Sequence, residues 1–448
     1  MGMAFVLGAG LSHAISPRLP LTDELGNLVR ARVPEAAARS ARGFRGGYFE
    51  AWLSRLAEPQ PDLLDHDNAS NYGLFLRVLV EIHRIVQERQ LEALTGEPPW
   101  WLHRLLGLMH TSSADVITFN YDTLIEHTLE VSRHGEWPTG ERSRASRLTR
   151  DVPPVYRPPA TYFETTGETF RLMKLHGSLD TFWAAGDRTG ATIQRWESAG
   201  GWGDPRTGDE ARRRQALPGR GPFIVPPAAA KSSFYSNPVT RELWRSAAEA
   251  LRAAEQVALI GYSMPPTDLV TSGMLIDALG GREVLVDVVN PDPDSLVSRL
   301  VAFGVAADDI TTVPTVENYV NELEGRTARR IADQLATADP TRSLLVATSS
   351  HAAARVTAVH RTGDTVRLDI ETVTDLHTTT RKLHNHDQLV VGTATLLEEL
   401  KPGERIVVGY PDGDEAAIVS TGQWDTPIGL GDGRWTVLVP SAIAGPAQ

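Results

Sequence analysis

Two polar residues that follow short apolar runs carry groups able to do chemistry. Asn120 comes after the run 115–119, and His176 follows the run 170–175. A neutral amide both donates and accepts hydrogen bonds, so Asn120 could orient a water molecule toward a reacting centre. Imidazole has an unperturbed pKa of roughly 6.5, near working pH, so His176 could act as a general base. Asn120 also has a structural interpretation, as a turn-stabilising residue, and a lone histidine such as His176 is usually structural.

A turn of small residues follows the first apolar run. Met3 to Leu7 reads as a buried strand, and Gly8-Ala9-Gly10 comes next, with Ser12 close behind. Small residues let backbone N–H groups approach a pyrophosphate at a helix N-terminus. The third glycine of the usual dinucleotide fingerprint is absent, because His13 stands in its place. The turn alone is therefore insufficient to predict a dinucleotide site.

The elements that must position these residues alternate between strands and helices. Helical spacing is expected over 72–94, 100–110, 123–131, 239–254 and 316–335, with Asp122 suited to cap the third of these helices. Short β-rich runs stand at 257–260, 284–289 and 310–313. This alternation predicts an α/β fold, a doubly wound Rossmann-like parallel sheet with helical insertions.

Two domains are expected. The α/β domain should span 1–338, with insertions near 30–112 and 133–222. After Pro340 the chain changes to short strands divided by Gly and Asp turns, for example 366–373, 405–408 and 435–439. Residues 341–448 are therefore predicted to form a small β-rich C-terminal domain.

Composition excludes several classes of site. The 448 residues include no cysteine, which rules out disulfides, thiolate nucleophiles, iron–sulfur clusters and cysteine-bearing zinc sites, and we expect no metal. The net charge of −12 argues against direct nucleic-acid binding. No run approaches the roughly 20 apolar residues of a membrane span, so we expect a cytoplasmic protein without membrane contact.

Four segments in fixed order resemble the sirtuin-like family over about residues 3–313. They are Ile117–Asp122, Lys174–Ser178, Ile260–Ser263 and Val289–Pro291. In that family the strand ends converge on NAD. The resemblance implies that the dinucleotide is lined by Gly8, Ala9, Gly10 and Ser12. It also implies that Asp122 contacts the nicotinamide carboxamide, and that the adenosine-side phosphates and ribose are held by Gly261, Ser263 and Asn290.

Departures from that family shape the predicted reaction. Deacylating sirtuins continue the first motif with Gly-Ile-Pro-Asp-Phe-Arg, whereas residues 15–21 here read Ile-Ser-Pro-Arg-Leu-Pro-Leu. They also carry a four-cysteine zinc module after the catalytic histidine, and residues 181–222 here contain no cysteine. Water is then the expected acceptor, with NAD as substrate and Asn120 and His176 as catalytic residues. The resemblance therefore implies an NAD glycohydrolase (NADase) that releases nicotinamide and ADP-ribose.

The divergent sirtuin-like branch of bacterial anti-phage defence has this character, which implies an NAD-depleting effector. It also implies a homo-oligomer, with a partner that is an ATPase or a nucleic-acid-guided protein. The alternatives are a protein deacylase or ADP-ribosyltransferase, and a non-catalytic sensor that binds NAD or ADP-ribose.

Overall fold

The structure of the chain is a computed structural model. It describes residues 2–40, 43–112, 114–131, 170–196, 201–205, 213–215, 217–228, 235, 237–265, 268–323 and 326, and six strands between 345 and 420. The predicted strand at 435–439 and the predicted helix beyond 323 lie outside these residues. So do residues 133–169, the first part of the insertion predicted near 133–222.

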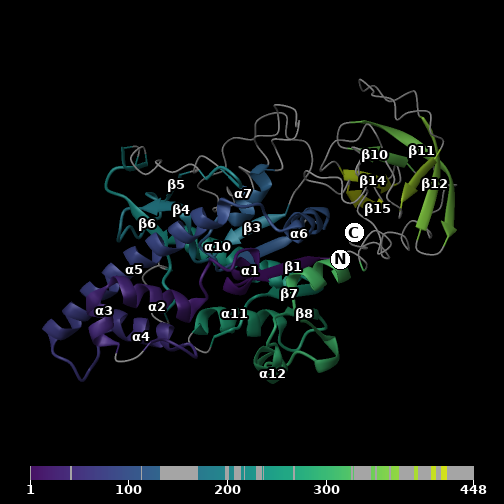
Figure 1. Ribbon diagram of the computed structural model, residues 1–448. Helices are drawn as coiled ribbons and strands as arrows, with labels where there is room; N and C mark the ends of the chain where they lie inside the picture. Colours follow the sequence, from purple (N-terminus) through teal and green to yellow (C-terminus); the bar gives the residue numbers. More distant parts are fainter. Residues whose placement is uncertain are drawn as a thin grey trace.

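A six-stranded parallel sheet forms the centre of the molecule (Figure 1). Its strand order is β3-β2-β1-β7-β8-β9, and every neighbouring pair is parallel. The strands are β1 (Met3–Leu7), β2 (Asp115–Thr118), β3 (Arg171–Lys174), β7 (Gln256–Ile260), β8 (Leu285–Val289) and β9 (Ile310–Val313). In order along the chain this is the 3-2-1-4-5-6 arrangement of Rossmann folds, so the predicted fold class is confirmed.

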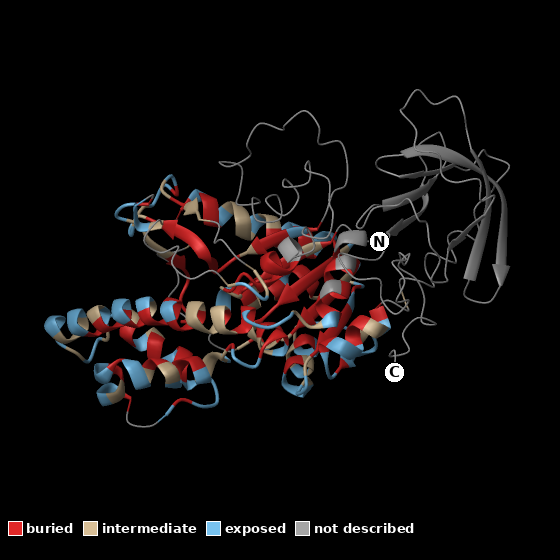
Figure 2. Cartoon of the chain, turned by 45° about the horizontal axis from the view of Figure 1, so that its top comes forward, coloured by how far each residue is buried: buried red, intermediate tan, exposed pale blue. Residues whose placement is uncertain are grey.

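Alternate side chains along each strand of this sheet pack into two hydrophobic cores, one on each face. In β1, Phe5 and Leu7 belong to one core, whereas Ala4 and Val6 belong to the other. Successive side chains of a strand point to opposite faces of the sheet. A strand that is apolar at every position must therefore be covered by other elements on both faces of the sheet. Figure 2 shows the resulting buried centre, drawn red. The second core is closed by α10 (Pro238–Ala253), α11 (Leu269–Leu279) and α12 (Asp294–Ala302).

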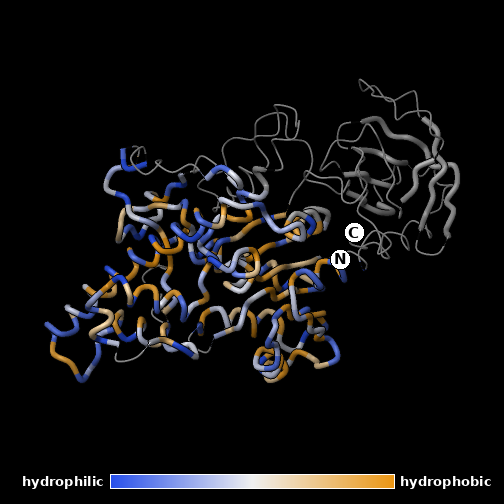
Figure 3. Tube along the Cα trace, viewed as in Figure 1, coloured by the Kyte–Doolittle hydropathy of each residue, from blue (hydrophilic) through white to orange (hydrophobic). Residues whose placement is uncertain are grey.

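The first core extends into a helical layer. Its helices are α1 (Ala9–Ile15), α2 (Thr22–Arg32), α3 (Pro34–Arg39), α4 (Tyr48–Ala57), α5 (Asp65–Leu94), α6 (Trp100–Thr111) and α7 (Leu124–Val131), and residues 316–323 are also helical. In Figure 1, α2, α3 and α4 lie along one side of α5, away from the sheet. Figure 3 shows hydrophobic and hydrophilic stretches alternating along these helices, as expected where one face of each is buried.

Two expectations are corrected. The helix expected over 72–94 begins at Asp65, because its first turns are polar and exposed and so carry no apolar periodicity. The region expected as an insertion after the histidine contains a three-stranded sheet with the order β5-β4-β6. Its strands are β4 (Gly177–Trp183), β5 (Gln194–Arg195) and β6 (Gly221–Ile224). Strand β4 is buried along its whole length, so it lacks the alternation that marks a strand in sequence.

A second six-stranded sheet lies in the C-terminal region. Its order is β13-β12-β11-β10-β14-β15, and all pairs are antiparallel. The strands are β10 (Leu345–Thr348), β11 (His351–Thr362), β12 (Thr365–Thr372), β13 (Gln388–Val391), β14 (Arg405–Gly409) and β15 (Glu415–Ser420). The β-rich character predicted from the sequence is thus present. None of the helices in the described parts of the chain has the length and apolarity required to cross a membrane.

Candidate active site at the carboxyl edge of the parallel sheet

The predicted site residues come from five segments that meet at one edge of the sheet (Figure 1). The last residues of five strands form one cross-strand row, which consists of Lys174, Thr118, Leu7, Ile260 and Val289. Gly8, Gly261 and Asn290 directly follow this row, and Asn120 and His176 stand two residues beyond it. Segments far apart in sequence therefore deliver their polar residues to the same edge.

The turn after β1 packs directly on the turn after β7. Gly8 N–H donates to Ile260 O at 3.0 Å, and Gly10 N–H donates to Gly261 O at 2.9 Å. A Cβ on Gly8 would lie 2.5 Å from Gly261 O. Gly261 has a φ of +60°, and a Cβ there would lie 2.2 Å from Leu11 N. These glycines are needed because two backbones touch, a more immediate reason than the predicted approach of a phosphate.

Asn120 is tied to this glycine turn by its amide group. Nδ2 donates to Gly8 O at 2.9 Å and to Ser12 Oγ at 2.8 Å. The backbone N–H of Asn120 donates to Thr118 Oγ1 at 3.1 Å. In the part of the chain that the structure describes, no group donates to Asn120 Oδ1. Both amide hydrogens are thus occupied, and the amide oxygen is the atom left to accept a hydrogen bond from water.

Ser12 connects Asn120 to a buried carboxylate. Ser12 Oγ donates to Asp122 Oδ2 at 2.5 Å, while Asp122 Oδ1 accepts the N–H of Leu124 at 3.3 Å, the first residue of α7. The helix begins one residue later than predicted, so Thr123 is at the cap position, and Asp122 stands one residue before it with its bond to Leu124 forming a turn that leads into α7. Since both carboxylate oxygens already accept bonds from the protein, Asp122 positions Ser12 here. Its contact with nicotinamide stays a prediction.

His176 lies one strand further along the edge, among aromatic rings. Its ring centroid is 4.9 Å from that of Phe119, the neighbour of Asn120, and 6.3 Å from that of Trp244 on α10. Nε2 lies 3.4 Å from the hydroxyl of Tyr235, whose pKa is raised by burial, so this hydroxyl stays protonated. The backbone carbonyl of His176 accepts the N–H of Val225 at 2.8 Å. His176 is buried, and Phe119 connects its ring to the Asn120 turn.

The other half of the edge is less tightly held. Ser263 is exposed. Asn290 is half-buried, and its Oδ1 accepts the N–H of Asp292 at 3.0 Å within its own turn. Between them, Met264 has a φ of +50°, in the left-handed region that non-glycine residues rarely adopt. A guanidinium hydrogen bond from Arg299 on α12 holds the Met264 carbonyl.

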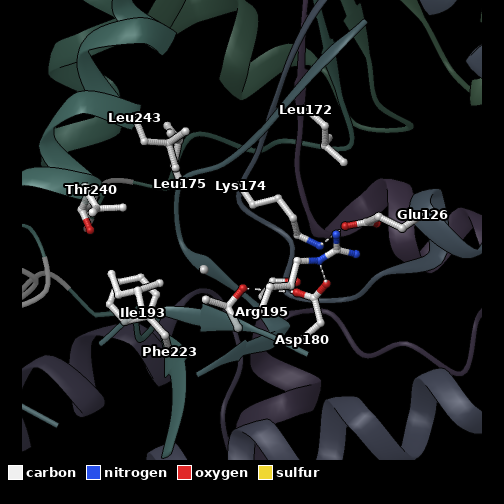
Figure 4. Close-up of a pocket in the computed structure, with 14 residues that line it drawn as sticks. Glu126, Leu172, Lys174, Leu175, Asp180, Ile193, Arg195, Phe223, Thr240 and Leu243 are labelled. Atoms are coloured by element: carbon white, nitrogen blue, oxygen red, sulfur yellow. Dashed lines mark hydrogen bonds and ion pairs between the residues drawn. The ribbon is translucent and has the colours of Figure 1, made fainter. Parts of the chain in front are cut away.

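A buried group of charged residues beside β3 was not predicted. Lys174 Nζ lies 2.9 Å from Glu126 Oε1 and also donates to the carbonyl of Asp122, while Arg195 Nε lies 2.5 Å from Asp180 Oδ2. The four side chains line a cavity of about 50 Å³ (Figure 4). Its apolar wall is formed by Leu172, Leu175, Ile193, Phe223, Val239 and Leu243. One sequence signal could have indicated this cluster. Lys174 stands two residues before His176, so its side chain lies at the end of the same strand, next to the predicted site.

The two carboxyl groups of this cluster are shifted in opposite directions. Burial raises the pKa of Glu126, and the Lys174 ammonium offsets this only in part. Burial also acts to raise the pKa of Asp180, but Arg195 and Lys174 outweigh it and hold that pKa below its usual value. Asp180 therefore stays ionised more readily than an ordinary aspartate, whereas Glu126 takes up a proton more readily than an ordinary glutamate.

Within the described ranges, no group of three or more His, Asp or Glu side chains has the arrangement needed to hold a metal ion.

The fold and this edge together define a doubly wound α/β protein with a polar site at the point where the strand order reverses. No protein-family model and no curated protein matches the chain. Among solved structures, the chain is similar to a Sir2 homologue in complex with NAD, with 14% identity, coverage of 72% of this chain and 87% of that one, and a TM-score of 0.32.

Two further solved structures are similar to the same degree. A Sir2–p53 peptide–NAD⁺ complex has 15% identity, a TM-score of 0.31 and coverage of 72% of this chain and 91% of that one. A structure described as the structural basis of sirtuin substrate affinity has 15% identity, a TM-score of 0.33 and coverage of 72% and 92%. Similarity of this degree is too low to transfer an activity.

Proposed function

We propose that this chain is an NAD glycohydrolase that cleaves the bond between nicotinamide and ribose and gives ADP-ribose to water. The observation that carries the proposal is the state of Asn120. Its amide hydrogens are fixed by Gly8 and Ser12, and its oxygen is left at the edge where the four family-like segments meet. A side chain pinned in this way can present one acceptor to one water molecule without rearrangement.

The proposed reaction breaks the bond between the anomeric carbon and the pyridinium nitrogen of NAD. The bonding electron pair leaves with nicotinamide, which becomes neutral, and the ribose carbon takes on oxocarbenium character. Water, held through a hydrogen bond to Asn120 Oδ1, adds its oxygen to that carbon. The proton that water releases passes to His176 or to solvent. The sum is NAD⁺ and water giving nicotinamide, ADP-ribose and one proton.

His176 suits either of two jobs in this scheme. Its ring packs against Phe119, which adjoins Asn120, so its place on the neighbouring strand end is fixed relative to the water site. It serves as the base, or it orients the ribose hydroxyls while solvent takes the proton. The nearby hydroxyl of Tyr235 at 3.4 Å would bias which ring nitrogen carries hydrogen.

The dinucleotide is proposed to lie across the contact between Gly8 and Gly261. This contact joins β1 and β7, the two strands between which the strand order reverses, and open α/β sheets bind ligands at such points. The N–H of Gly10 already donates to Gly261 O and is not available to a phosphate. We therefore assign the phosphates and the adenosine ribose to Asn290 and to the side of the edge where Ser263 is exposed.

Water is proposed as the acceptor in place of an acylated lysine. The sheet β5-β4-β6 follows His176 at the point where deacylases place their four-cysteine module, and the chain has no cysteine. By resemblance, the setting proposed is NAD depletion in bacterial anti-phage defence. A homo-oligomer and a partner that is an ATPase or a nucleic-acid-guided protein belong to the same proposal.

The deciding experiment is chromatography of products after the purified full chain is incubated with NAD, with and without an acetylated peptide. We expect nicotinamide and ADP-ribose in equal amounts in both reactions. Acetylated ADP-ribose formed only with peptide would show deacylation, and ADP-ribose attached to protein would show a transferase. NAD that binds in calorimetry but remains intact would show a sensor. Any of these three results would contradict the hydrolase.

A further inference from the structure

Helix α5 exposes an apolar stripe that the rest of the described chain leaves uncovered. Tyr72, Leu76 and Val80 are 49%, 47% and 53% exposed, and they recur at the four-residue spacing that aligns side chains on one helix face. The opposite face of α5 packs on α2, α3 and α4 through buried residues such as Leu74 and Val78. Figure 1 shows these three helices on a common side of α5. The stripe is thus presented on a supported helix.

Small residues lie on the same stripe between the large ones. Ala69 precedes Tyr72, and Gly73 falls between Tyr72 and Leu76. A Cβ built on Gly73 would meet only the guanidinium of Arg77, at 4.0 Å, so the space above this glycine is open. A helix face on which large side chains alternate with small residues can pack against a second copy of itself, because the large side chains of each copy fill the space over the small residues of the other.

Charge is divided along the stripe. Asp65 and His66 are exposed at its N-terminal end, and Arg77 and Arg84 are exposed toward its C-terminal end. Two parallel copies would set Asp65 against Asp65 and Arg84 against Arg84. Two antiparallel copies would instead set each Asp65 against the other chain's Arg84, so opposite charges would meet at both ends.

We propose that two copies of this chain associate through antiparallel packing of their α5 helices, with Gly73 of each helix facing Leu76 of the other. In this register Ala69 faces Val80, so a small residue receives a large one at two successive levels. Tyr72 faces Arg77, which suits a cation–π contact. A single two-fold axis generates all of these pairs twice, as an isologous interface requires.

The size of the surface sets the expected strength. A stable dimer buries about 800 Å² on each partner, and one helix face offers less than that. We therefore expect micromolar association, visible by sedimentation velocity of the full chain between about 1 and 100 µM. Val80→Asp should weaken association at least tenfold. Val301→Asp provides the matched control, because Val301 is 43% exposed on α12 and far from the stripe in sequence and fold.

The register has its own test, which uses the absence of cysteine. The double variant Ala69→Cys with Val80→Cys should form a disulfide-linked dimer on oxidation, because each cysteine faces the other type across the axis. An internal bridge is excluded, since the two positions lie about 16 Å apart along one helix and a disulfide needs Cα atoms within about 7 Å. The double variant Ala69→Cys with Leu76→Cys should cross-link far more slowly.

Charge exchange gives a third readout. Asp65→Arg and Arg84→Asp should each weaken association, and the double variant should restore it. A chain that stays monomeric at 100 µM overturns the proposal, as does a dimer that Val80→Asp leaves unchanged. A dimer that cross-links through Ala69→Cys with Leu76→Cys and not through the predicted pair would disprove this packing of α5.

Discussion

The two halves of the sheet edge are built differently. On the β1–β2 side, Asn120, Ser12 and Asp122 form a continuous chain of hydrogen bonds that is largely buried. On the β7–β8 side, Ser263 is exposed, and among the described contacts the side chain of Asn290 bonds only within its own turn. The first half is assembled before any ligand arrives, whereas the second offers side chains whose bonding capacity is still open.

This difference separates two tasks. A group that acts on a reacting atom must be held in position in advance, because its own reorganisation would add to the barrier. A group that only holds a ligand loses little if it settles when the ligand binds. We therefore expect changes on the β1–β2 side to act on turnover, and changes on the β7–β8 side to act on affinity.

The largest effect should come from the contact that joins the halves. Gly261→Ala should lower the free energy of unfolding by several kcal/mol, because its Cβ would meet Leu11 N at 2.2 Å. Gly281→Ala is the control, since Gly281 has a similar φ of +69° with nothing within 4 Å of its Cβ position. It should cost only about 1–2 kcal/mol, the cost of the left-handed backbone. Equal losses in urea unfolding would mean that the contact between the turns is unimportant.

His176→Ala should lower kcat for NAD by about 10²–10⁴-fold, as expected for loss of a base or a ribose anchor. Its Tm should fall less than that of the cavity-forming variant Phe119→Ala, since Phe119 lies in the second core. His176→Gln separates the two jobs, because a glutamine can orient a ribose but is not a base at neutral pH. Recovery of most activity in this variant would assign His176 to orientation.

Asn120→Ala should lower kcat by about 10²-fold and also cost about 1–3 kcal/mol of stability, because two hydrogen bonds are lost with it. Ser12→Ala is the matched variant. It removes a partner of the same amide but leaves Asn120 Oδ1 in place. We expect a comparable change in urea unfolding and a much smaller loss of turnover. If Ser12→Ala is as inactive as Asn120→Ala, the amide oxygen has no special part in catalysis.

On the other half, Ser263→Ala and Asn290→Ala should each raise KM for NAD by about three- to tenfold and leave kcat nearly unchanged. The exposed position of Ser263 predicts no loss of stability. A fall in kcat with constant KM would contradict the proposal that the β7–β8 side of the edge acts on affinity and the β1–β2 side on turnover.

The smallest effect is a pH dependence of stability beside β3. Because burial raises the pKa of Glu126 above 4.5, its stabilising contribution is complete below that value and is lost as pH rises through the raised pKa. Glu126→Gln should therefore gain in Tm relative to the parent as pH rises. Asp180→Asn should behave oppositely, since the pKa of Asp180 is lowered, and its deficit should shrink as pH falls. Thermal melts from pH 4 to 8 would test both, and parallel profiles would contradict the shifts.

Sequence patterns predicted a doubly wound parallel sheet because short apolar runs alternate along the chain with stretches of helical spacing. The same patterns missed β4, since Gly177–Trp183 is buried throughout and includes Asp180. They also missed the pairing of Lys174 with Glu126, which lie on different elements and meet only after the fold forms. The dinucleotide contacts predicted for Gly8 and Gly261 stay predictions, and the direct contact between their two turns became visible only in the structure.

The single row of strand ends has a consequence for how such a protein can change over time. Gly8, Gly261, Asn290, Asn120 and His176 are each one or two positions past the end of their own strand, and this count is unaffected by what lies between the strands. The helices α2 to α6 and the sheet β5-β4-β6 occupy such intervals. A lineage could lengthen, trim or exchange these inserts, and so alter what reaches the edge, while the residues along the edge kept their places.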